Sequence, residues 1–154
     1  MNVNPDYDLL AKIREEFEGY YPSAYQDTGT VWTIGYGSTY NFAKDRKVQK
    51  GDTIDKITAR AWMRIEDQEI IRQLNFYIKK PLDLAQSTAI VDYVYNRGIG
   101  NFLKTELDEL INANPKDQEI FYEIQGTGWK DRLGNVLRGL QRRRNMEAHL
   151  YVTG

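Results

Sequence analysis

Three residues near the start of the sequence have the types and the spacing that acid–base chemistry needs. Glu18 closes a predicted helix, where the negative end of the helix dipole and the flanking aromatic residues favour the protonated form of its carboxyl. Asp27 lies in a polar turn that favours ionisation. Two carboxyls kept in opposite protonation states can cleave a glycosidic bond by acid–base hydrolysis. Thr33 could hold a water beside Asp27, and Gly35, on the same strand face, leaves room for a ligand.

Composition removes most other kinds of catalytic site. The chain has 154 residues and no cysteine, which excludes disulfides, thiolate metal sites and cysteine nucleophiles. Its single histidine, His149, argues against histidine-rich metal sites and Ser-His-Asp triads. We therefore expect no metal and no cofactor, and carboxylates remain for catalysis. The alternative for any one Glu–Asp pair is a solvated surface, because the chain contains 22 acidic residues.

Local patterns predict the elements that position these residues. A helix over 5–18 is expected to begin with Asn4 as its cap and to end before Gly19, which suits the left-handed position after a helix. The turn signal at 27–30 and the alternation over 31–36 predict a small antiparallel sheet that continues to about residue 50.

The rest of the chain has a helical pattern. Thr58 is expected to cap a long helix that runs to about residue 78. Residues 83–96 are apolar or small nearly all round, as in a central buried helix. Shorter helices are expected over 103–113, 116–125 and 135–150.

This order of elements predicts an α+β fold that is mostly helical, with one small antiparallel sheet near the N-terminus. The length indicates a single domain over 1–154. Within it we expect a small β lobe at about 20–55, a connecting helix at about 58–78, and a helical lobe formed by about 80–154 with the helix 5–18.

The net charge of −1 conceals an uneven distribution. Residues 128–154 contain six basic and two acidic residues, a local charge of +4, so the preceding residues carry −5. The basic run Arg142–Arg144 is by default a solvated helix face, and without an aromatic platform it does not indicate nucleic-acid binding. No stretch approaches the roughly 18 apolar residues of a membrane span, and residues 1–10 lack the features of a secretory signal. We expect a soluble chain that does not export itself.

Three separated segments resemble the phage-type lysozymes, glycoside hydrolase family twenty-four. They are Glu18-Gly19 with Ala24-Tyr25, Asp27, Gly29 and Thr33-Ile34-Gly35-Tyr36-Gly37; then Gln86–Gly98; then Trp129 with Gly139–Glu147. In that family a catalytic Glu is followed after eight residues by an Asp and after five more by a Thr, and this chain has both gaps. It departs from the family at Ser38, where many members have His. The resemblance covers nearly the whole chain and implies a lysozyme-like fold with two lobes around a cleft.

The resemblance implies an endolysin-type muramidase that hydrolyses the β-1,4 bond between N-acetylmuramic acid and N-acetylglucosamine in bacterial peptidoglycan. Glu18 would protonate the glycosidic oxygen, while Asp27 would activate water or attack the sugar. Because Thr33 could position a water, we favour inversion of configuration. The alternative is a non-catalytic peptidoglycan-binding or virion structural module on the same fold. Retention of Glu18, Asp27 and Thr33 together argues against that alternative.

Further site residues follow from the same resemblance. Tyr95 and Asn96 match the wall of the cleft, where an aromatic ring stacks on a sugar and an amide binds an acetamido group. Their alternative roles are core packing for Tyr95 and a helix cap for Asn96. Tyr25 could also bind substrate, with strand packing as its alternative. Gly35 and Arg143 would support the site, the latter because the family suggests an ion pair from the basic run to Glu18.

The resemblance also implies a place of action. The protein would be a monomer by default, made in the cytoplasm of the bacterial host. It would reach the cell wall, and cause host cell lysis, after a separate protein permeabilises the membrane.

The basic segment 128–154 leads to a prediction about salt. If its charge attracts the anionic cell wall, lytic activity on intact walls should fall as ionic strength rises from low to physiological values. Turbidity loss of wall suspensions, measured over a salt series, tests this. Activity that does not change with salt would remove that role from the segment.

Overall fold

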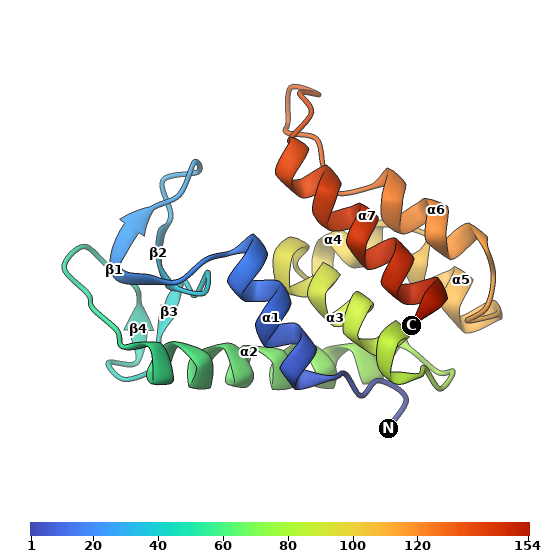
Figure 1. The fold of residues 1–154 in the computed structure, drawn as a ribbon, viewed down its shortest axis with the longest axis horizontal. Helices are drawn as coiled ribbons and strands as arrows, with labels where there is room; N and C mark the ends of the chain where they lie inside the picture. Colours follow the sequence, from blue (N-terminus) through green and yellow to red (C-terminus); the bar gives the residue numbers. More distant parts are fainter. The chain divides into compact units, whose positions relative to one another are not determined.

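The computed structural model describes residues 1–154 and contains seven helices and four strands (Figure 1). By its contacts the chain divides into two compact units. Residues 11–66 form what we call the β unit, and residues 1–10 with 67–154 form the helical unit. The boundaries between the units fall inside the helices α1 (Tyr7–Phe17) and α2 (Lys56–Tyr77).

The β unit contains two short antiparallel sheets instead of the one that was expected. Strand β1 (Tyr21–Gln26) pairs with β2 (Trp32–Gly35), as the turn signal between them predicts. Strand β3 (Tyr40–Asn41) pairs separately with β4 (Arg46–Lys47). The loose continuation of the first sheet to about residue 50 is therefore a second hairpin.

The start of α1 differs from its prediction. Asp6 Oδ1 accepts the backbone N–H of Leu9 at 3.1 Å, so Asp6 is the cap and not Asn4. The N–H of Asn4 instead donates to Ser87 Oγ at 3.0 Å, which holds the preceding residues against the helical unit. At the other end the prediction is confirmed, because Gly19 has a φ of +71° and donates its N–H to the carbonyl of Arg14.

Helix α2, unlike α1, begins earlier than expected. Asp55 Oδ1 accepts the N–H of Thr58 at 2.7 Å, so Asp55 is the cap and Thr58 lies inside the helix. This contact lowers the pKa of Asp55, because the backbone N–H of Thr58 stabilises the charged carboxylate. In both helices the observed cap is an Asp two or three residues from the predicted one.

The helical unit is built around α3 (Leu84–Arg97), which is buried from Gln86 to Val94. Asp83 and Gln86 form a reciprocal capping box at its start, and Gly98, with a φ of +83°, ends it. Helix α7 (Arg138–Thr153) packs against α3 and against α6 (Glu119–Gly126), as Figure 1 shows.

The segment 103–113, expected as one helix, contains a break. Helix α4 (Ile99–Lys104) ends and α5 (Leu107–Ala113) begins on either side of Thr105. The Thr105 hydroxyl donates to the carbonyl of Phe102 at 2.6 Å and accepts the N–H of Leu107 at 3.1 Å. These side-chain bonds replace the regular backbone bonds of a continuous helix.

Two of the three arginines expected on a solvated helix face lie in the core. Arg143 donates twice to Asp92, from Nε at 2.9 Å and from Nη2 at 2.8 Å, and is 2% exposed. Arg144 is fully buried, lies over the ring of Tyr93 and pairs with Glu147 at 2.5 and 2.8 Å. Burial, and then the charge of Asp92, raise the pKa of Glu147 well above its usual value. The ion pair between Arg143 and Asp92 joins α7 to α3, whereas the pair between Arg144 and Glu147 lies within α7.

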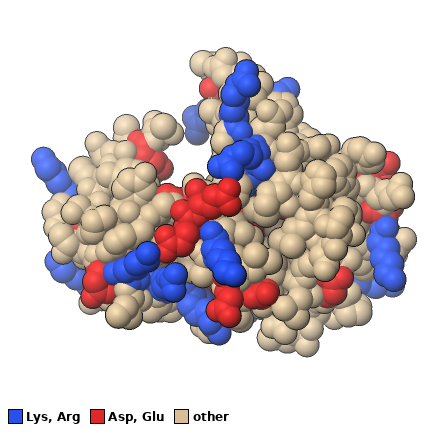
Figure 2. Space-filling view, in the orientation of Figure 1, with Lys and Arg blue, Asp and Glu red and all other residues tan.

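The exposed charge of the basic segment is therefore smaller than its composition indicates. Figure 2 shows basic side chains gathered over the loop before α7 and over the start of α7. The exposed residues of the segment that carry a formal charge are Lys130, Asp131, Arg132, Arg138 and Arg142. No helix is both long and apolar enough to span a bilayer.

Candidate active site

Asp27 lies in the hairpin between β1 and β2 and builds the turn with one of its two carboxylate oxygens. Oδ1 accepts the N–H of Gly29 at 2.8 Å and the N–H of Val31 at 2.9 Å. Thr30, between them, adopts a φ of +64°, which the two bonds help to hold. Because both bonds use Oδ1 and Asp27 is exposed, Oδ2 is left for a water or a ligand.

Thr33 is tied to the same turn through the carbonyl of Val31. This carbonyl accepts the backbone N–H of Asp27 at 2.9 Å and the Thr33 hydroxyl at 3.0 Å. The Thr33 hydroxyl therefore donates its proton to an acceptor within the protein. In any further hydrogen bond its oxygen can only act as the acceptor. One backbone oxygen joins two of the three predicted catalytic residues.

Glu18 follows the last residue of α1 and is half-buried. Its N–H donates to the carbonyl of Arg14 at 2.9 Å, so its backbone continues the helical pattern up to Gly19. The phenol of Tyr25 is influenced by the charges of both carboxylates. Burial raises the pKa of Tyr25, and the charges of Tyr21, Glu18 and Asp27 add to this effect. Both carboxylates therefore act on the same phenol.

Tyr25 opposes Thr33 across the β1–β2 pair and is half-buried. Its ring centroid lies 4.4 Å from that of Tyr21, at an interplanar angle of 39°. The pair presents an aromatic surface on the strand that leads to Asp27.

Gly35 has a different role from the one expected. A Cβ at this position would lie 3.2 Å from Cβ of Ala59 in α2, and the φ of +65° also requires glycine. The space beside Gly35 is therefore occupied by helix packing and does not accommodate a ligand.

The other predicted site residues belong to the helical unit. Tyr95 and Asn96 lie in the last turn of α3 and are half-buried. The bond that closes this helix runs from the N–H of Gly98 to the carbonyl of Val94, so Asn96 is not its cap. The Asn96 Oδ1 is buried and makes no hydrogen bond within the protein. Arg143 is engaged with Asp92.

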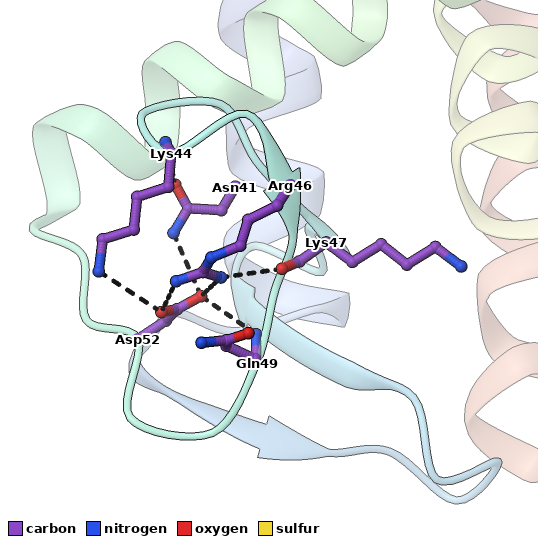
Figure 3. A network of polar contacts seen from close by, with 6 residues as sticks. All are labelled: Asn41, Lys44, Arg46, Lys47, Gln49 and Asp52. Atoms are coloured by element: carbon purple, nitrogen blue, oxygen red, sulfur yellow. Dashed lines mark hydrogen bonds and ion pairs between the residues drawn. The ribbon is translucent and has the colours of Figure 1, made fainter.

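A polar network on the far edge of β1, which sequence analysis missed, supports the hairpin. Figure 3 shows Asn41, Lys44 and Arg46 directed at the carboxylate of Asp52. Arg46 binds it through two bonds of 2.8 and 2.9 Å, and Asn41 donates at 3.2 Å. The Asp52 carbonyl in turn accepts the N–H of Ala24 at 2.9 Å, in the middle of β1.

This network gives β1 neighbours on both edges. Residues 52–54 run antiparallel to β1, with a bridge between Ser23 and Thr53. They pair where β1 leaves its regular register with β2. No sequence motif indicates this role of Asp52, because its side-chain partners Asn41 and Arg46 are brought to it by the pairing of β3 with β4.

No group of three or more His, Cys, Asp and Glu side chains converges as a metal site would require. Ser38, which stands where the family often has His, is buried, and its hydroxyl makes no hydrogen bond within the protein.

Comparisons with known proteins find relatives in sequence and in structure. The chain is 34% identical over 99 residues to an endolysin of Acyrthosiphon pisum secondary endosymbiont phage 1, a match that covers 64% of each protein. It is 28% identical over 142 residues to an endolysin of Bacillus phage B103, covering 91% of this chain and 51% of that protein. The structure of an endolysin from Escherichia coli O157:H7 phage FAHEc1 is 26% identical, with a TM-score of 0.86, and the match covers 99% and 96% of the two chains.

These likenesses place the fold among the lysozymes. The family model of phage lysozyme matches residues 15–147, which include the hairpin, α3 and most of α7. The chain therefore belongs to the phage lysozyme family. Its matches span less than two thirds of the length of the first two relatives.

The Asp52 network leads to a prediction about acid stability. The bonds from Arg46 hold the pKa of Asp52 far below its usual range. Because the folded-state pKa is lowered, the network stabilises the fold above the unfolded-state pKa of about 3.9, and that contribution is lost as pH falls below it. The Asp52→Asn variant should therefore lose less stability than the wild type between about pH 5 and pH 2.

Urea unfolding followed by circular dichroism at several pH values measures this difference. Glu106→Gln, which removes an exposed carboxylate in the helical unit, serves as the control and should follow the wild type. Parallel stability curves for wild type and Asp52→Asn would contradict the prediction.

Proposed function

We propose that this protein is a muramidase that hydrolyses the β-1,4 bond between N-acetylmuramic acid and N-acetylglucosamine in bacterial peptidoglycan. Glu18 acts as the general acid and protonates the glycosidic oxygen that leaves. Asp27 acts as the general base and removes a proton from the attacking water. Membership of the phage lysozyme family supports the reaction, and the hairpin geometry supports the roles.

The observation that carries this proposal is the shared acceptor at Val31. Thr33 donates to the Val31 carbonyl, so its oxygen accepts one proton of a bound water, while Asp27 Oδ2 accepts the other. A water held through both protons directs its lone pairs away from the hairpin, towards an anomeric carbon. The same carbonyl binds the N–H of Asp27, which keeps the two acceptors in one rigid turn.

The hairpin and the end of α3 supply the proposed substrate contacts. Tyr25, beside Asp27 on the hairpin, is the residue we infer to stack on a sugar ring, because its ring is half-buried and supported by Tyr21. Tyr95 and Asn96 remain proposals that rest on the family resemblance, as does support of the site by Arg143. The family resemblance is also the basis for synthesis in the bacterial cytoplasm and release by a separate membrane-permeabilising protein.

Removing the acid tests the proposed reaction. Glu18→Gln keeps the size of the side chain and removes its proton, so lysis should fall by about 10²- to 10⁴-fold. Turbidity loss of purified peptidoglycan measures the rate, and appearance of reducing ends shows that glycosidic bonds are cut. Glu16→Gln, an exposed neighbour on the same helix, is the matched control and should retain activity.

Two outcomes would overturn parts of the proposal. Clearing by Glu18→Gln at the rate of the wild type would remove Glu18 from the role of acid. Wild-type protein that binds peptidoglycan without releasing reducing ends would instead indicate a non-catalytic wall-binding module.

The configuration of the product tests the role of Thr33 and Asp27. If they hold a water for direct attack, hydrolysis inverts the anomeric centre, and the first product released from the β-linked substrate is the α anomer. Proton NMR of soluble peptidoglycan fragments, recorded before mutarotation, distinguishes the anomers. A β anomer as first product would make Asp27 a nucleophile.

A further inference from the structure

Glu15, on the last turn of α1, accepts three donors on a single oxygen. Its Oε1 receives the Tyr36 hydroxyl at 2.5 Å, Lys56 Nζ at 3.0 Å and Arg60 Nη2 at 3.5 Å. The hydrogen bond from Tyr36, followed by that from Lys56, lowers the pKa of Glu15, so the carboxylate is charged. The cluster joins the end of α1, the residue after β2 and the start of α2, all within the β unit.

The donors of this cluster differ in how firmly they are held. The side chains of Lys56 and Arg60 are each 54% exposed, and exposed ion pairs contribute little to the stability of a fold. Tyr36 is 1% exposed, and its ring is fixed by packing. The hydroxyl of Tyr36 is therefore the donor that sets the position of Glu15.

Tyr36 contacts the chain on both sides of Glu18. Its hydroxyl binds Glu15, three residues before, and its ring lies 5.7 Å from that of Tyr20, two residues after. Tyr20 is itself anchored, because its hydroxyl donates to the carbonyl of Ile54 at 2.9 Å. The short stretch that carries Glu18, from the end of a helix through Gly19, is thus held at two points by one buried side chain.

We infer that Tyr36 is a positioning residue for the proposed acid Glu18, acting through its hydrogen bond to Glu15 and its ring contact with Tyr20. Tyr36 also lies three residues after Thr33, so it links the segment of the acid to the strand of the water-binding residue. This inference rests on the proposed function. A catalytic group has to be held within about 0.5 Å of its productive position, and small displacements cost large factors in rate.

Tyr36→Phe isolates the hydrogen bond, because it removes the hydroxyl and keeps the ring on Tyr20. With soluble peptidoglycan fragments as substrate, kcat should fall by about 10- to 100-fold while KM changes little. Glu15→Leu should have the same effect, whereas Glu15→Gln retains an acceptor oxygen and should keep most of the activity. Tyr40→Phe removes the hydrogen bond of another tyrosine, to Asp45 in the same unit, and should behave as wild type.

The Glu18→Gln background separates positioning from general destabilisation. If Tyr36 acts through Glu18, adding Tyr36→Phe to Glu18→Gln causes no further loss of the residual rate. Circular dichroism at the assay temperature establishes that each variant is folded. An unchanged kcat in Tyr36→Phe, or the same fold-loss in both backgrounds, would overturn the inference. Full activity of Glu18→Gln alone would instead refute the proposed function.

Discussion

The carbonyl of Val31 is the acceptor on which the candidate active site depends. It accepts hydrogen bonds from the N–H of Asp27 and from the hydroxyl of Thr33, so the two residues are fixed relative to the same oxygen. A hairpin of two short strands has little stability of its own. The loop at 52–54, held by the Asp52 network, therefore has to support β1 from its other edge.

The helical unit is organised by a different kind of interaction. Asp92, Arg143, Arg144 and Glu147 are buried together, where charges are costly unless they are paired and hydrogen-bonded. The bidentate pair between Arg143 and Asp92 joins α7 to α3, and it lies beside the apolar core that is packed around α3.

The features that the sequence predicts correctly are those that depend on residues close together in the chain. The C-terminal ends of α1 and α3 are predicted correctly, because a glycine with positive φ needs no distant partner. The break at Thr105 was missed, since a threonine inside a helical pattern has no distinctive signal. The burial of Arg143 was missed because Asp92 lies 51 residues away, and the bond from Tyr36 to Glu15 spans 21 residues. The spacing of Glu18, Asp27 and Thr33 indicated candidate chemistry, but their support is tertiary.

Asp27 has a consequence for how freely this protein could evolve. Active-site carboxylates commonly reduce stability, so their replacement gives a sturdier but inactive fold. Here one oxygen of the side chain closes the turn, while the residue itself is exposed to solvent. Losing the carboxylate would remove the two hydrogen bonds of the turn together with the proposed catalytic role, so a lineage that abandoned catalysis would gain no stability at this position. Substitution of Asp27 is therefore not favoured by any gain in the stability of the fold.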